Sequence, residues 1–192
     1  MRNKKLLKWV QMAMLCAIAY IFILLIRFPI FPATPYLVYD AGDIPLLIGS
    51  FLFGPVAGFI MTVVVSALQA IFLSADGLVG FAMHVIASGA LVLVAGAVYR
   101  RFHNRKFAAV GLIAGTLAMA AVMIPANLIF TVNFYGVPQE TVWATMPFTV
   151  GFNLVKAAIN SVVVFLVYKP LSRLFKRTGE KPERGKNRTG QE

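Results

Sequence analysis

The stretch Asn153-Leu-Val-Lys156-Ala-Ala-Ile-Asn160 lies inside residues 148–168, an otherwise apolar run that is long enough to cross a ~30 Å hydrocarbon core at ~1.5 Å per residue. Lys156 is the single charge in that run. A lysine at the centre of a membrane helix costs roughly 2.5–3.5 kcal/mol, so its ammonium should face a partner, a ligand or water. Asn153, Lys156 and Asn160 share one helix face at i, i+3, i+7 spacing. We expect this face to line a small-molecule site; alternatively, backbone carbonyls or a membrane interface satisfy the lysine.

The composition predicts an integral membrane protein. Of 192 residues, 59% are hydrophobic and 13% charged, with a mean hydropathy of +0.80, whereas soluble domains average about 25% charged residues. A lone cysteine, Cys16, excludes a disulfide framework and a cysteine metal site. The first apolar run, residues 9–26, has no small-residue cleavage site, so we interpret it as a retained helix and not as a signal peptide.

The basic residues indicate the topology. All of them except Arg27 and Lys156 fall within residues 2–8, 100–106 and 169–188, and Asp40, Asp43, Asp76 and Glu140 lie in the segments between. This positive-inside pattern predicts an even number of spans with both termini cytoplasmic. The same placement argues against a nucleic-acid partner, despite a net charge of +11.

Apolar runs and breakers predict an all-α single bundle of six transmembrane helices. We expect helices near 6–28, up to 53, 56–73, 78–98, 107–130 and 148–168, with an outer loop at 131–147. Residues 1–177 would form the membrane domain, and residues 178–192 a basic disordered tail. The proline-rich, aromatic connection 29–43 should fold over the bundle as an outer lid, with Asp43 as the N-cap of the next helix.

Polar residues on the other helices leave alternatives open. Ser66 and Gln69 can line a cavity or bond between helices, and for His84 we favour packing or ligand contact over proton relay. No predicted helix carries a carboxylate, and no HExxH, GxSxG or Walker motif is present, so neither an enzyme nor an ion-coupled transporter is indicated. The AxxxA pair Ala13 and Ala17 suits either internal packing or close approach of another helix.

Three segments resemble the riboflavin-specific substrate-binding (S) components of energy-coupling factor (ECF) transporters. They are PYLVYDAGDIPLLIGSFLFGPVAG at 35–58, GFAMHVIAS at 80–88 and FNLVKAAIN at 152–160. The resemblance implies a multi-pass protein of the bacterial cytoplasmic membrane that captures riboflavin outside. It also implies docking, through Ala13 and Ala17, on a membrane coupling subunit that two cytoplasmic ATPases drive. Riboflavin would be the transported ligand, with no cofactor and no metal.

The resemblance also assigns roles to individual residues. Asn153, Lys156 and Asn160 would bind the ribityl hydroxyls, and Asn127, or else Asn133, would bind the polar edge of the isoalloxazine ring. The remaining contacts would come from Leu37, Val38 and Tyr39 of the lid and from Met83. A flavin needs such a combination of apolar walls, an amide and several donors. An S component for another vitamin, or an autonomous secondary transporter, remains the alternative.

Overall fold

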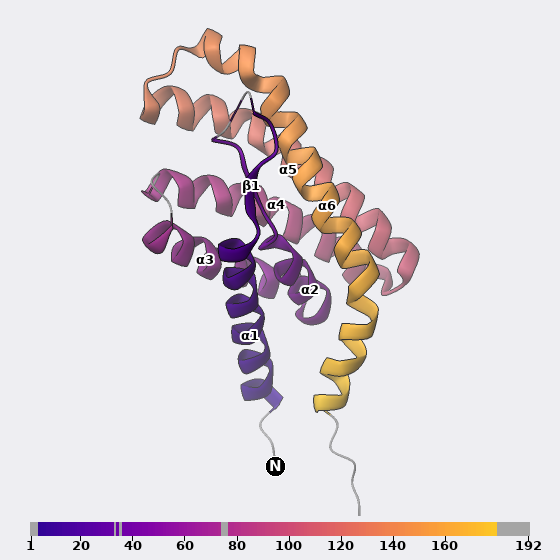
Figure 1. Ribbon diagram of the computed structural model, residues 1–192. Helices are drawn as coiled ribbons and strands as arrows, with labels where there is room; N and C mark the ends of the chain where they lie inside the picture. Colours follow the sequence, from indigo (N-terminus) through magenta and orange to yellow (C-terminus); the bar gives the residue numbers. More distant parts are fainter. Residues whose placement is uncertain (1–3, 33, 35, 74–76, 180–192) are drawn as a thin grey trace, which may run out of the picture.

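The computed structural model describes residues 4–32, 34, 36–73 and 77–179. Its helices are α1 (Lys4–Leu25), α2 (Asp43–Phe53), α3 (Pro55–Phe72), α4 (Gly77–Phe102), α5 (Arg105–Tyr135) and α6 (Gln139–Gly179). Two short strands, β1 (Arg27–Pro29) and β2 (Val38–Asp40), connect α1 to α2 (Figure 1). The turn at 74–76 and most of the predicted tail, residues 180–192, lie outside the described residues.

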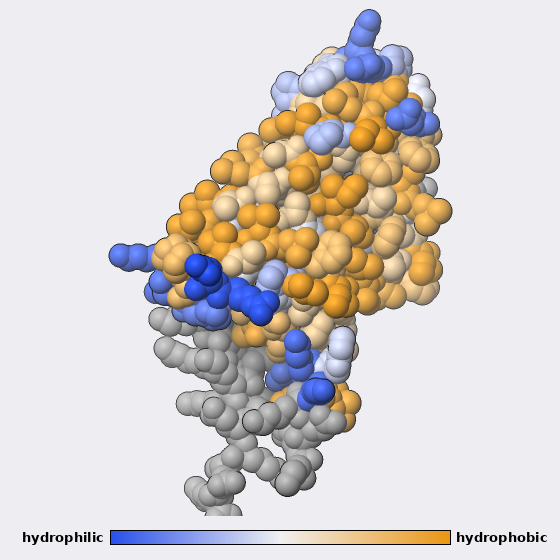
Figure 2. Space-filling view, turned by 180° about the vertical axis from the view of Figure 1, so that it is seen from behind, coloured by the Kyte–Doolittle hydropathy of each residue, from blue (hydrophilic) through white to orange (hydrophobic). Residues whose placement is uncertain are grey.

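The predicted helical membrane bundle is confirmed in outline. Five of the described helices are long and apolar enough to cross a membrane, and α2 is a shorter apolar helix. The surface in Figure 2 is mostly hydrophobic between its ends, where the hydrophilic side chains gather. A hydrophobic band of this kind is what a lipid-facing surface requires.

Helix α2 occupies the centre of the bundle. Residues 43–51 are all buried, and α2 contacts α1, α3, α4 and α6. A helix that is apolar on all sides is stable only when other elements surround it. The predicted break after α2 is confirmed: Gly54 has φ +99°, and Pro55 opens α3, where its missing N–H is not needed.

Helix α4 packs closely against the turn between α2 and α3. Ser50 Oγ donates a hydrogen bond to the carbonyl of Val92 at 2.9 Å. A Cβ added at Gly96 would collide with Ser50 Oγ and lie 3.1 Å from Pro55 Cα. Glycine at position 96 therefore sets the distance between these helices.

The connection after α1 differs from the irregular lid that we predicted. Helix α1 ends at Leu25, and the strands form an antiparallel hairpin in which Arg27 pairs with Asp40 and Pro29 with Val38. Strand pairing satisfies backbone N–H and C=O groups in a segment that packs against an apolar bundle. Prolines are compatible with a two-stranded ribbon because every strand in it is an edge strand.

The predicted outer loop at 131–147 is wrong. Helix α5 continues to Tyr135, α6 begins at Gln139, and Gly136 ends α5 in the left-handed conformation at φ +64°. Pro125 lies inside α5. At 31 residues, α5 spans about 46 Å, which exceeds the ~30 Å core. Its polar end therefore remains helical beyond the apolar layer.

Candidate ligand cavity beneath the hairpin

A cavity of about 200 Å³ lies where the hairpin meets α3, α4, α5 and α6. One part of its wall is apolar and includes Leu37, Val38, Phe81, Met83, Ala87, Met119, Met123 and Phe152. The polar part includes Arg27, Asp40, Ser66, Gln69, His84, Ser88, Asn153 and Lys156. A wall that combines apolar side chains with convergent polar groups is compatible with a small-molecule site.

Lys156 forms an ion pair with a carboxylate of the hairpin. Its Nζ donates to Asp40 Oδ2 at 2.7 Å, and the two side chains are only 5% and 6% exposed. Asp43 Oδ2 lies 3.9 Å from the same nitrogen. Lys156 thus has a protein partner, and this partner is a carboxylate and not the backbone carbonyls considered above.

The charge of Asp40 is favoured by its surroundings. Burial alone would raise the pKa of Asp40, but the Lys156 ammonium, together with a hydrogen bond from the Gly42 N–H at 3.1 Å, holds that pKa below its ordinary value. A buried charge pair of this geometry needs both members, because either one alone would remain desolvated and unpaired.

Tyr39 and Asn160 reinforce the junction between the hairpin and α6. The Tyr39 hydroxyl donates to Asn160 Oδ1 at 2.8 Å. Asn160 Nδ2 lies 3.4 Å from both the Asp40 carbonyl and Asp43 Oδ2. We call Tyr39, Asp40, Lys156 and Asn160 the hairpin latch, since their side chains join the hairpin to α6.

Asp43 does not cap α2 as we predicted from the sequence, but lies inside the bundle. Gly42 occupies the N-cap position of α2 and provides no side-chain cap, whereas Asp43 is the first helical residue and is fully buried. Its carboxylate faces Lys156 and Asn160 instead of capping the helix, because those donors lie within the bundle. The argument that no carboxylate lies among the helices is therefore also wrong.

The residues proposed for a ligand occupy three different places. Leu37, Val38, Met83, Asn153 and Lys156 line the cavity. Tyr39 and Asn160 are buried behind it in the latch. The two candidate asparagines of α5 lie apart from the cavity lining: Asn127 donates to the Met123 carbonyl and Asn133 to the Ile129 carbonyl, at 2.8 and 2.7 Å.

Asn153 retains an acceptor for the cavity. Its Nδ2 donates to the Thr149 carbonyl at 2.8 Å. The side chain is buried against the cavity, so its oxygen is the group that a ligand donor would meet.

Helices α3 and α4 add a polar wall that the sequence only partly revealed. Ser66 Oγ lies 2.6 Å from His84 Nδ1, and Ser88 Oγ 3.5 Å from His84 Nε2. Ser66 therefore does both things considered above, because it bonds between helices and lines the cavity. Gln69 Oε1 is buried and has no hydrogen-bond partner in the described part of the chain. A buried acceptor without a donor is a natural point of contact for a ligand.

Sequence reasoning missed Asp40 and Asp43. A signal for them existed: the lone membrane lysine required a partner, and these two carboxylates are the acidic residues of the lid segment. Treating the lid as loop and cap separated them from the helix that they contact.

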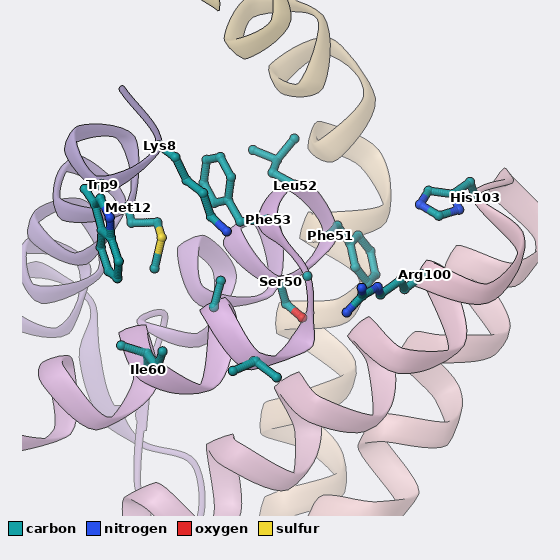
Figure 3. A pocket seen from close by; sticks show the side chains of 13 residues that line it. Lys8, Trp9, Met12, Ser50, Phe51, Leu52, Phe53, Ile60, Arg100 and His103 are labelled. Carbon is teal, nitrogen blue, oxygen red and sulfur yellow. The ribbon is translucent and has the colours of Figure 1, made fainter. Parts of the chain in front are cut away.

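A second pocket, of about 450 Å³, opens near the start of α1 and the end of α4 (Figure 3). It is lined by Lys8, Trp9, Ser50, Arg100 and His103, among others. None of the residues proposed for the ligand lines this larger pocket. The alanines at 13 and 17 are exposed on α1, so they do not pack inside the bundle.

Most of the chain is similar to a known family and to named transporters. It matches the family described as ECF transporter, substrate-specific component, over residues 7–168. It is 32% identical over 183 residues to riboflavin transporter RibU of Staphylococcus aureus (strain TCH60), covering 92% of this chain and 94% of that protein. It is 29% identical over 179 residues to riboflavin transporter FmnP of Bacillus subtilis (strain 168), covering 85% and 91%.

A solved structure, described as the S component of a bacterial ECF transporter, has the same fold. It superposes with a TM-score of 0.75 at 34% sequence identity, covering 88% of this chain and 98% of the solved chain. The fold, the family match and these relatives agree with one another, and this multi-pass membrane protein belongs to the family of substrate-specific components of ECF transporters.

Proposed function

We propose that this chain captures riboflavin with high affinity at the outer face of the bacterial cytoplasmic membrane and delivers it to an ATP-driven ECF uptake transporter. Relatives aligned over most of the chain are named as riboflavin transporters. The observation that carries the proposal is the cavity beneath the hairpin, in which an apolar wall faces Lys156, Asn153 and Gln69.

The two kinds of wall suit the two parts of riboflavin. The flat isoalloxazine ring would lie against Met83, Leu37 and Val38, where burial of apolar surface is favourable. The ribityl hydroxyls would bond to Asn153 and Lys156, which supply an acceptor and a donor. Each hydroxyl left without a partner would weaken binding by roughly 1–3 kcal/mol, and this penalty selects against analogues.

Binding must enlarge the cavity. Its volume of about 200 Å³ is below the ~300–1,000 Å³ of typical ligand pockets. We infer that the hairpin moves outward as a lid, so that Tyr39 and Asn160 of the latch become available to the ligand. Asn127 of α5 would bind the polar ring edge, for which its amide would exchange the bond to the Met123 carbonyl for a bond to the ligand.

The remaining parts of the chain support this role. Both termini would be cytoplasmic by the positive-inside pattern, with residues 1–177 as the membrane domain and 178–192 as a basic tail. Ala13 and Ala17 are exposed one turn apart on α1, so the backbone of a coupling subunit can approach closely there. Two cytoplasmic ATPases would supply the energy.

Flavin binding is the direct test. The purified protein in detergent should carry a yellow flavin spectrum or quench riboflavin fluorescence on titration. A panel with thiamine, biotin and folate separates flavin from another vitamin. If the protein is colourless and leaves riboflavin fluorescence unchanged, riboflavin is excluded as the ligand, while membership of the family still holds.

The docking role is tested separately. Leucine at Ala13 and Ala17 should abolish uptake while riboflavin affinity is unchanged; leucine at the exposed Ala121 of α5 is the matched control. If riboflavin affinity fell as much as uptake, the substitutions would be disturbing the packing of the bundle and not the docking of a coupling subunit. Uptake by this chain alone, in cells without coupling-factor subunits, would favour an autonomous transporter.

A further inference from the structure

An apolar groove of about 310 Å³ runs along the outside of the bundle between α5 and α6. On α5 it follows the stripe Ala109, Ile113 and Leu117, and on α6 it passes Ala158 and Phe165. The small side chains of Ala109 and Ala158 make room for the groove. Ile113 and Leu117 line it as well and remain 63% and 58% exposed. The groove is separate from the ligand cavity, since the two share no lining residue.

The length of the groove matches one leaflet of a bilayer. Ala109 and Leu117 are eight residues apart, which is about 12 Å of helix, against about 15 Å for half of the hydrocarbon core. A transmembrane helix of a partner protein would contact the bundle across both leaflets of the bilayer. A single acyl chain would extend through one leaflet only, which is the length of this groove. A chain-sized groove within one leaflet is therefore better suited to a lipid than to a protein.

A fixed cation lies at the mouth of the groove. Arg105 precedes Ala109 by four residues and so continues the α5 stripe. Its guanidinium carbon lies 5.2 Å from the centre of the Phe165 ring, a cation–π arrangement that holds the charge over the groove wall.

The surroundings of Arg105 are strongly basic. Arg100, Arg101 and Lys106 are exposed beside it at the junction of α4 and α5, and hydrophilic side chains gather at the lower edge of the hydrophobic surface in Figure 2. Among the residues described, none of these four cations has a carboxylate within 4.0 Å. Their charges are therefore available to an external anion.

We propose that an anionic phospholipid binds here, with one acyl chain in the α5–α6 groove and its phosphate on Arg105 and Lys106. Basic residues at the headgroup level attract anionic lipids, and the groove adds van der Waals contact along the chain. The expected gain is about fivefold in affinity for each basic residue that contacts the headgroup.

Native mass spectrometry of the delipidated full chain in detergent tests the proposal. The probes are phosphatidylglycerol and phosphatidylcholine with identical acyl chains, added in equal amounts. Wild-type protein should retain phosphatidylglycerol at least fivefold better. Arg105→Gln should lower that preference about fivefold, whereas Lys8→Gln, which removes an exposed cation from α1, should not change it.

Filling the groove is the second arm. Ala158→Phe, at an exposed position of the groove, should reduce retention of both lipids, whereas Val110→Phe, on another face of α5, should not. Circular dichroism and a monodisperse elution profile establish that each variant is folded. Equal retention of the two lipids by wild type, or unchanged retention by folded Ala158→Phe, would overturn the proposal.

Discussion

The ion pair between Lys156 and Asp40 predicts an asymmetric loss of stability. Both side chains are about 5% exposed and their charged atoms are 2.7 Å apart. Removing one member of a buried pair costs about 3–5 kcal/mol because the other charge remains desolvated. Lys156→Met leaves two buried carboxylates, Asp40 and Asp43, with no cation between them, so we expect the full penalty.

Asp40→Asn should cost less than Lys156→Met. The ammonium then keeps Asp43 Oδ2 at 3.9 Å, and the loss is mainly that of one charged hydrogen bond, about 1.5–3 kcal/mol. In the double variant the Asp40 carboxylate is removed together with the ammonium, so that only Asp43 keeps a buried charge without a cation. It should therefore be more stable than Lys156→Met alone, with a coupling energy of about 1–3 kcal/mol.

Thermal unfolding in detergent measures these differences. For a chain of this size about 1 kcal/mol shifts Tm by about 2–4 °C, so Lys156→Met should lower Tm by about 6–20 °C. Lys106→Met, an exposed lysine of α5, is the control and should change stability by less than about 0.5 kcal/mol. Equal effects of the two single variants, with strict additivity in the double variant, would refute the latch as an interacting unit.

Three further predictions concern pH, packing and the polar wall. Because the folded pKa of Asp40 is below its ordinary value, its stabilising contribution should be complete above about pH 5 and disappear as the pH falls below about 4; a Tm series against pH should show this loss in wild type and not in Asp40→Asn. Gly96→Ala should cost about 1–3 kcal/mol through overpacking, whereas Gly151→Ala, whose Cβ would meet only one atom at 3.9 Å, should be neutral or stabilising by up to about 1 kcal/mol in the same unfolding assay. Gln69→Leu removes a buried acceptor that has no partner, so Tm should be unchanged or higher. Because the ligand is expected to donate to that oxygen, the same substitution should weaken riboflavin binding by about 5–150-fold. Unchanged affinity in a fluorescence titration would show that Gln69 does not contact the ligand.

The membrane bundle was predictable because hydropathy and breakers act locally. Long apolar runs leave few structures possible in lipid, and Gly54 followed by Pro55 permits only a break. The helix ends at 131–147 were not predictable in the same way. Polar residues there resemble a loop, but a helix extending beyond the apolar layer can carry them, and the stop signals Gly136 and Pro138 mark only a short break.

The sequence predicted one polar helix face of the cavity, but not the other elements that enclose it. The spacing of Asn153 and Lys156 predicts one shared helix face, and both residues line the cavity. Asn160, on the same face, turned out to bond to the hairpin, and this depends on a pairing of strands 27–29 and 38–40 that residue patterns do not specify. The carboxylate of Asp40 reaches α6 across 116 positions of sequence, a distance over which local patterns carry no information.

The latch connects ligand capture to the movement of the hairpin. While the hairpin is closed, Lys156 donates to Asp40, and Asn160 accepts from Tyr39. A ligand that needs these donors must therefore replace bonds that already exist. In a dry cavity the separated charges would be strongly unfavourable, but water entering an opened hairpin lowers that cost, and ligand hydroxyls can then take the place of water. On the proposed riboflavin role, the order of events would be opening first, exchange of partners second, and closure over the ligand last.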